Sequence, residues 1–543
     1  MSSFLLISAS ALMGIALLLV GIYLAYPRQV LAMVRARAND SLDLDTHNGK
    51  SDYSLPGFLP VREELEHEQV KVEGCLPKDL EGVYLRNGTN YQFDQIQSRR
   101  HMFNGAGMLH QIQILDGKAT YSNCYIRTPR FEAQQTLGRE LYAEFGDIAG
   151  GGKAALFKVL AEAMEKRRGL IPAIPDLDNG SNTTAIQFHH DKLYCLQETC
   201  RPFVLDTRIE NGRLVLPGTG YIEDFSGQLG APFTAHPKID PATGDWYWYS
   251  TDIRSGKVHF GQLTEGKLSR FSELLSAEPA IGFLHDYFLT ERYSVFPDVS
   301  LRSDMKALTG SSGSPFFFDP DHKLRFGVIA RDHQDGKPIR WFTTDLPGHI
   351  WHVINGWEET RADGGTDIVL FAPVFREYPA TVPIHSSDEP HAYLHKFRFN
   401  LETGEVTEQR KLLDHFYERP TYNTAYTGRQ NRYAYLLDEQ QSGGIMGKGV
   451  LKYDLLEERE LEYFDYGEYY GGEALFVARP DATGEDDGYI IDLLMAEDRA
   501  HLLVLDARNM TELARLHLPQ RVPFGVHGCW LSNVQLGQLK HPA

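Results

Sequence analysis

Along most of the chain, short apolar or alternating segments are separated by turn signals, which is the pattern of β-strands joined by tight turns. Segments rich in β-branched or aromatic residues include Trp246 to Thr251, Arg325 to Ala330, Tyr433 to Leu437 and His501 to Asp506. Gly-containing turn signals recur as well, among them Asn211-Gly212-Arg213, Thr243-Gly244-Asp245, Glu265-Gly266-Lys267 and Thr403-Gly404-Glu405. The chain is therefore expected to be all-β, as a barrel, a sandwich or a propeller. Four-stranded blades repeated around an axis are the most economical choice for this length, although no strict sequence period is visible.

The N-terminus differs from this pattern. Phe4 to Tyr26 carries no charged residue and is long enough to span a bilayer. No Lys or Arg precedes it, which favours an uncleaved transmembrane helix over a cleaved targeting peptide. Arg28, Arg35 and Arg37 follow, and the positive-inside rule then places the body on the cytoplasmic face. The expected organisation is a membrane anchor over residues 1–37, a polar linker over residues 38–55 and a single body over residues 56–543.

One later segment has the periodicity of a helix. Between Lys153 and Arg168, the apolar residues fall on one broad side and the charged residues cover the other. Two interpretations are open. The segment is a helix packed on the body, or it is an interfacial helix that dips into a membrane, which its apolar side and basic end allow.

Composition narrows the classes of function. Hydrophobic residues make up 42% of the chain and charged residues 23%, which is ordinary for a globular protein with a large core. The net charge of −19, with no dense basic run, argues against a nucleic-acid partner. The five cysteines are scattered and odd in number, so free thiols in a reducing compartment are expected.

The richest candidate chemistry lies in the stretch from Leu346 to Glu359, which holds two histidines, two tryptophans and two carboxylates. His349 and His352 are three residues apart, so a strand would direct them to opposite faces, and the apolar neighbours of His352 favour it for the interior. The alternative is a core histidine bonded to a backbone carbonyl. Three more histidines have apolar or aromatic surroundings, namely His236, His285 and His527. They are so far apart that only tertiary structure could unite them, and spacing alone does not establish this.

Two further motifs make the pattern recognisable. Both precede the four histidine settings in the chain, and they are Leu80-Glu81-Gly82-Val83-Tyr84-Leu85-Arg86-Asn87-Gly88 and Phe103-Asn104-Gly105-Ala106-Gly107-Met108-Leu109-His110. Together these motifs resemble those of the carotenoid cleavage oxygenase family, over nearly all of the chain after about residue 55. The resemblance implies a seven-bladed β-propeller capped by a helical and loop dome. It also implies a non-haem Fe(II) ion on the propeller axis, held by His236, His285, His352 and His527 without a ligating carboxylate.

The resemblance also marks three carboxylates. By the family pattern, Glu198, Glu418 and Glu473 accept hydrogen bonds from His285, His352 and His527 respectively, and His236 has no such partner. This agrees with physical chemistry, because a carboxylate on the far N–H of a ligating imidazole fixes its tautomer and its orientation.

The activity implied by the resemblance is oxidative cleavage of a double bond in a carotenoid or apocarotenoid by O2, giving carbonyl products. No organic redox cofactor and no obligate protein partner are expected. The lipophilic polyene would lie in an apolar tunnel, and Phe103, Phe283 and Trp357 are the candidate wall residues. A substrate dissolved in a bilayer would also explain a membrane as partner.

Alternatives remain. Gln197 precedes Glu198 where stilbene-cleaving relatives often have a lysine that binds a phenol, which counts against stilbenes without excluding them. Thr89, Gly356 and the pair Thr199-Cys200 also depart from the family pattern. A stilbene-cleaving dioxygenase and a retinyl-ester isomerohydrolase use the same scaffold. A non-enzymatic propeller that serves as an interaction platform would not need four buried histidines with outer carboxylates.

Overall fold

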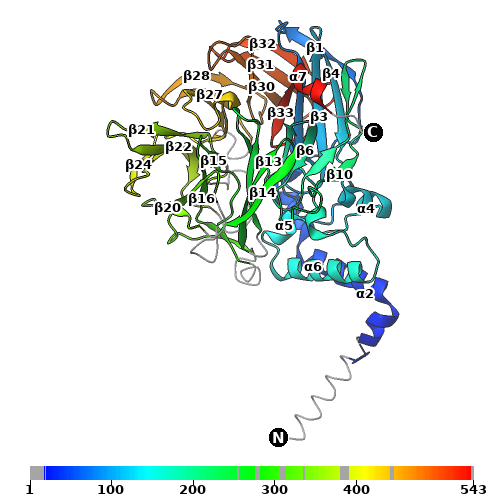
Figure 1. The fold of residues 1–543 in the computed structure, drawn as a ribbon. Coiled ribbons are helices and arrows are strands. Elements are labelled where there is room, and N and C mark those ends of the chain that lie inside the picture. Colours follow the sequence, from blue (N-terminus) through cyan, green and yellow to red (C-terminus); the bar gives the residue numbers. More distant parts are fainter. Residues whose placement is uncertain are drawn as a thin grey trace.

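The computed structural model describes residues 17–18, 20–252, 256–274, 282–304, 314–333, 337–378, 390–440 and 446–539. Antiparallel β-strands dominate it, as the sequence predicts, and five sheets of four strands form propeller blades (Figure 1). The first two blades are β5 (Ala185–His189), β6 (Lys192–Leu196), β7 (Phe203–Leu205) and β10 (Gly220–Ile222), then β11 (Lys238–Ile239), β12 (Trp246–Asp252), β13 (Lys257–Thr264) and β14 (Lys267–Leu274). The third is β15 (Phe288–Leu289), β16 (Tyr293–Asp298), β19 (Arg325–Ala330) and β20 (Arg340–Thr343). The last two are β21 (Asn355–Thr360), β22 (Thr366–Phe375), β23 (Ala392–Asn400) and β24 (Val406–Lys411), then β25 (Tyr417–Thr421), β26 (Tyr433–Asp438), β27 (Gly449–Asp454) and β28 (Arg459–Asp465).

The remaining long strands form one sheet of nine. Its order is β29 (Leu475–Ala478), β30 (Gly488–Met495), β31 (Ala500–Asp506), β32 (Glu512–His517), β1 (Glu68–Gly74), β4 (Lys118–Tyr125), β3 (Ala106–Leu115), β2 (Gly82–Asn90) and β33 (Gly528–Ser532). The expectation of seven separate blades is therefore wrong for the described residues, where five are found. The reason is that β1 pairs with β4 through Glu68 to Val70 and with β32 through Lys71 to Gly74, so it joins strands from both ends of the chain.

Neighbouring sheets pack face to face through shared apolar clusters. Trp357 and Phe371, from β21 and β22, lie in one cluster with Leu436 and Tyr453, from β26 and β27. Every residue of β27 and of β30 is buried, because these strands are covered on both faces. The core is thus a series of layers between sheets. The two small sheets, β8 (Arg208–Glu210) with β9 (Arg213–Val215) and β17 (Leu301–Ser303) with β18 (Phe316–Phe318), stand outside this series.

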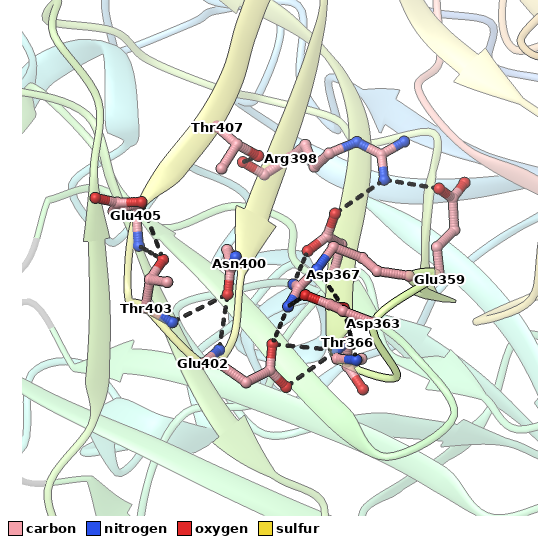
Figure 2. Close-up of polar contacts among 12 residues, drawn as sticks. Glu359, Asp363, Thr366, Asp367, Arg398, Asn400, Glu402, Thr403, Glu405 and Thr407 are labelled. Atoms are coloured by element: carbon pink, nitrogen blue, oxygen red, sulfur yellow. Dashed lines mark hydrogen bonds and ion pairs between the residues drawn. The ribbon is translucent and has the colours of Figure 1, made fainter.

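The turn predicted at Thr403-Gly404-Glu405 is confirmed, between β23 and β24. Gly404 has a φ of +82°, which a residue without Cβ adopts at no steric cost. Figure 2 shows how side chains fix the turn: the Asn400 side-chain oxygen accepts hydrogen bonds from the backbone N–H groups of Glu402 and Thr403. The Glu402 carboxylate accepts the N–H of Thr366 from the neighbouring turn, which holds the two turns of this blade together.

The predicted transmembrane helix over Phe4 to Tyr26 is not supported. Residues 4–16 and 19 of this segment lie outside the described residues, and no helix in the described part of the chain is both long enough and apolar enough to cross a bilayer. Tyr26 leaves the helical conformation, and α2 (Pro27–Ser41) begins at the following proline. The prediction of a membrane anchor, and with it the placement on the cytoplasmic face, is therefore wrong for the described residues. The membrane as partner is not supported either. The expected linker region holds the end of α2, then α3 (Leu44–Lys50) and the short 3-10 helix η1 (Asp52–Ser54).

The helices gather mostly at one end of the molecule, where α2, α5 (Phe145–Ile148) and α6 (Gly152–Arg167) lie close together (Figure 1). The helix predicted from Lys153 to Arg168 is confirmed as α6. Its small and charged residues face inward, since Ala155, Lys158, Ala161 and Glu165 are buried. The apolar residues Leu156, Phe157, Val159, Leu160 and Met164 are instead 36–52% exposed.

Buried ion pairs stabilise this packing, in which α6 turns alanines and charged residues toward the protein interior. Lys158 Nζ lies 2.6 Å from Asp147 Oδ2 on α5, with both side chains almost fully buried. Arg35 of α2 pairs with Glu165 of α6 and donates a second hydrogen bond, of 2.8 Å, to the Leu141 carbonyl. Buried charges of this kind are costly when one partner is missing.

The remaining helices are α4 (Pro129–Leu137), α7 (Asn533–Gln538) and the 3-10 helices η2 (Pro56–Phe58), η3 (Asp176–Asp178) and η6 (Thr424–Tyr426).

Arg35→Ala is therefore expected to destabilise the protein by roughly 3 kcal/mol, the lower end for breaking a buried pair, because Glu165 would keep only Arg139 at 3.7 Å. Urea unfolding would measure the loss. Arg37→Ala, on the exposed side of the same helix, is the matched control and should cost well under 1 kcal/mol. An equal loss for the two variants would show that α2 does not depend on the ion pair.

Candidate metal centre

Four histidines that are distant in the sequence meet at one place. His236, His285, His352 and His527 lie in loops, one to three residues before β11, β15, β21 and β33 respectively. Each of these strands stands at the edge of its sheet, and the four strands belong to four different sheets. The fold therefore directs the starts of four edge strands to a common point. Pro237 also favours an extended backbone at His236.

The imidazole Nε2 atoms point at one another. His236 Nε2 lies 3.0 Å from His285 Nε2, which lies 3.3 Å from His352 Nε2, which in turn lies 3.2 Å from His527 Nε2. In this cluster all four candidate ligand atoms are within 4.8 Å of one another. Two adjacent nitrogen ligands of an octahedral ion at about 2.1 Å would be about 3.0 Å apart, so the spacing fits a single metal ion.

Burial favours the neutral form of two of these rings, which is the form that can bind a metal. Loss of water holds the pKa of His236 well below its ordinary value, and the neighbouring imidazoles lower it further. The pKa of His352 is also well below its ordinary value, chiefly because of burial. A neutral imidazole keeps a lone pair on one ring nitrogen, which is the state that binds a metal.

Three carboxylates stand behind the rings. His285 Nδ1 lies 2.5 Å from Glu198 Oε1, His352 Nδ1 lies 2.5 Å from Glu418 Oε2, and His527 Nδ1 lies 3.0 Å from Glu473 Oε1. Burial alone would raise the pKa of Glu198 and of Glu473, but His285 and His527 outweigh it and leave both values below the usual one. Each of these three rings thus has a carboxylate at the nitrogen that faces away from the cluster.

A continuous row of aromatic rings leads away from the cluster. Trp351 touches His285 edge-on, with ring centroids 5.1 Å apart, and Phe283 touches Trp351 at 5.4 Å. The row continues through Phe283–Phe316 at 5.5 Å, Phe316–Phe145 at 5.7 Å and Phe145–Phe103 at 5.8 Å. The rings come from five separate segments of the chain, so they form a wall that only the folded protein has.

A narrow pocket, part of it open to solvent, lies beside this wall. Phe283 and Glu198 both line it, so it extends from the aromatic row to the carboxylate behind His285. Phe233, Tyr249 and Leu284 add further apolar surface, and Ser303 adds a hydroxyl. Three further residues with hydroxyl groups also line it, so its surface is mixed in polarity.

Of the residues selected from the sequence as tunnel walls, Phe103 and Phe283 belong to the row, and Trp357 does not. Trp357 is 2% exposed, stacks on Phe371 and donates a hydrogen bond of 2.9 Å to Glu359 within its own blade. Trp351 was not among the predicted wall residues, although it stands beside His352 in the stretch from Leu346 to Glu359. Phe145 and Phe316 carried no signal, because their neighbours in the sequence are unrelated to the histidine motifs.

His349 is not among the four clustered histidines. It is fully buried against Trp351, at a ring separation of 4.4 Å, and Tyr378, at 5.4 Å. Neither of its ring nitrogens has a hydrogen-bond partner among the described residues. Burial accordingly holds its pKa well below the ordinary value.

Comparisons with known proteins agree with this architecture. Residues 58–532 match the family model described as retinal pigment epithelial membrane protein. The carotenoid 9,10(9',10')-cleavage dioxygenase 1 of Arabidopsis thaliana is 32% identical over 89% of this chain and 92% of its own. Among solved structures, the lignostilbene dioxygenase of Pseudomonas brassicacearum matches with a TM-score of 0.73 and 26% identity, over 89% of this chain and 98% of its own. A Synechocystis apocarotenoid oxygenase matches with a TM-score of 0.71 and 24% identity, over 88% and 98%.

The chain belongs to this family, that of the carotenoid cleavage oxygenases. The family assignment made from the motifs is thereby confirmed. The chain is an enzyme of the oxygenase class, and its four clustered histidines fit a metal site.

We expect His349→Leu to retain all bound metal and to leave stability unchanged or raised by about 1 kcal/mol, because it removes a buried polar ring that has no hydrogen bond. Metal content by mass spectrometry and thermal unfolding would test this. His352→Leu provides the contrast, since it removes a member of the cluster and should deplete the metal. Metal loss in the His349 variant as large as in the His352 variant would contradict the assignment.

Proposed function

We propose that the protein is a non-haem Fe(II) dioxygenase that cleaves a double bond of a carotenoid or apocarotenoid to two carbonyl products. The observation that carries the proposal is the convergence of four imidazole Nε2 atoms next to an apolar aromatic wall. The iron would be held by His236, His285, His352 and His527, and when bound it would activate dioxygen. The sequence relatives include carotenoid cleavage dioxygenases, which supports the reaction, and one protein that shares the fold is a cobalt-substituted Synechocystis enzyme.

The carboxylates have the task of orienting the rings. Glu418 and Glu473 accept hydrogen bonds from Nδ1 of His352 and His527, and Glu198 pairs with Nδ1 of His285 at 2.5 Å. A carboxylate at Nδ1 favours the tautomer in which Nε2 is unprotonated and faces inward. Three carboxylates together with a divalent ion leave a small net charge in a buried place, so the site is electrostatically tolerable.

The wall has the task of positioning the substrate. A conjugated polyene is long, stiff and apolar, and the row of rings from Phe103 to Trp351 offers an apolar surface that ends at His285. Cleavage at one bond among many similar bonds requires that a single bond be held beside the reactive centre, which a fixed wall achieves.

A stilbene is the second candidate, because a lignostilbene dioxygenase is a structural relative. Here Gln197 is the informative residue. Its side-chain oxygen accepts the N–H of Asn182 at 2.8 Å, and its side-chain nitrogen donates to Thr199 at 3.0 Å. Each end of the amide already has one protein partner, and Gln197 lacks the ammonium group that a lysine at this position would offer to a phenol. This observation favours the polyene.

Products formed under labelled dioxygen would test the reaction. We expect the anaerobically prepared iron protein to convert a carotenoid or an apocarotenoid into two carbonyl products that both carry label, while stilbenes with a para-hydroxyl group react at least tenfold more slowly. The comparison should include retinyl esters. Release of a free alcohol without label would instead identify a hydrolase, and stoichiometric iron with no conversion of any substrate would exclude the proposal.

Glu473→Gln is expected to weaken metal binding about 10–100-fold, because it removes the charge behind His527 and one acceptor for the Gly528 N–H. Competition with a chelator would measure the metal affinity. Glu485→Gln is the control, since Glu485 also accepts backbone N–H groups, from Arg432 and Tyr433, but far from the cluster. The role assigned to Glu473 is wrong if both variants bind metal equally well.

A further inference from the structure

A further carboxylate, fully buried, lies next to the cluster and contacts backbone and lysine rather than imidazole. Asp286 follows His285 in the chain and is 2% exposed. Its Oδ1 accepts hydrogen bonds from the Tyr287 N–H at 2.8 Å and from Lys238 Nζ at 2.7 Å. Its Oδ2 accepts the Val353 N–H at 3.1 Å. The carboxylate is thus bonded through both oxygens in a dry environment, where charge-assisted hydrogen bonds are strong.

The partners of Asp286 belong to different histidine loops. Lys238 stands two residues after His236, and Val353 stands directly after His352. Asp286 itself stands directly after His285. A single carboxylate therefore connects three of the four loops, which otherwise lead into edge strands of three different sheets, β11, β15 and β21. The fourth loop is tied separately, because the Gly528 N–H bonds to Glu473.

This role differs from that of the glutamates. Glu198, Glu418 and Glu473 contact ring nitrogens, so they set how each imidazole is rotated. Asp286 contacts the main chain and a neighbouring side chain, so it sets where each loop stands. A shift of a few tenths of an ångström in one loop would move its Nε2 out of the 3.0–3.3 Å spacing that suits one ion.

We propose that Asp286 is the positioning residue of the metal centre: by bonding to Lys238 and to the Val353 N–H, it fixes the spacing of His236, His285 and His352. The inference rests on the metal site of the proposed function, and it is independent of which substrate is cleaved. Loss of the Asp286 charge would leave the protein folded, with three loops free to drift apart and with a lower affinity for metal.

The chain contains a matched control. Asp147 is a fully buried aspartate with the same set of partners: Lys158 Nζ at 2.6 Å and the backbone N–H groups of Arg99, at 3.0 Å, and Glu144, at 3.1 Å. It bonds to the helical end of the molecule and not to the histidine loops. Asp286→Asn and Asp147→Asn thus remove the same charge from the same kind of site, with and without a connection to the cluster.

The experiment compares Fe(II) affinity, by anaerobic competition with a chelator, with the thermal stability of the metal-free proteins. Both aspartate variants should unfold at lower temperature than the wild type, but only Asp286→Asn should bind Fe(II) about 10–100-fold more weakly, the range for losing a residue that supports ligands. Its Co(II)-substituted form should also show an altered visible absorption spectrum, which a general loss of stability would not change.

A second pair of variants keeps the test decisive if Asp286→Asn does not fold. Lys238→Met breaks only the bond to the His236 loop and should weaken Fe(II) binding, whereas Lys158→Met breaks the equivalent bond to Asp147 and should not. Wild-type affinity in Lys238→Met, or equal weakening in the two members of either pair, would overturn the inference. A wild-type protein that binds no Fe(II) would overturn the proposed function itself, so the two failures are distinguishable.

Discussion

Imidazole Nε2 atoms that all carry lone pairs repel one another at short distance, and a metal ion bound between them would relieve this repulsion. Here consecutive Nε2 atoms around the cluster are only 3.0–3.3 Å apart, and their histidines stand beside edge strands of four different sheets. The rest of the structure can be understood as the means of holding this arrangement. Edge strands bring the loops together, glutamates set the rotation of three rings, and Asp286 connects three of the loops. The row of aromatic rings from Phe103 to Trp351 ends at the same point.

The histidines and glutamates could be selected from the sequence because each stands in a distinctive motif. The wall was harder to predict. Phe103 and Phe283 lie within or beside such motifs, but Phe145 and Phe316 join the row only through tertiary contacts. Trp357 was misplaced because a tryptophan near a histidine motif can face either the site or the core, and here it fills the core between two blades. Asp286 was overlooked since its importance depends on Lys238 and Val353, which are remote in the sequence.

Alternation and turn residues predicted the strands and several turns, as at Gly404. They could not predict how the strands pair, because pairing is decided between segments far apart, and β1 has partners on both sides. Hydropathy left two interpretations of α6 open, packing on the body or contact with a membrane. The helix packs through alanines and paired charges and leaves its large apolar residues exposed, so the side that faces the body is not the apolar one. The ion pairs that make this possible, such as Arg35 with Glu165, cannot be inferred from one helix alone.

The position of β1 has a consequence for the order in which the protein assembles. During synthesis this strand emerges early, whereas β32, its partner through Lys71 to Gly74, is among the last strands to leave the ribosome. Until then β1 has an unpaired edge, and such edges invite aggregation. The delay also applies to His527, which arrives with β33 when that strand pairs with β2. The four imidazoles can therefore meet only after the last strands have paired, so a metal ion bound there would stabilise complete molecules selectively over nascent chains.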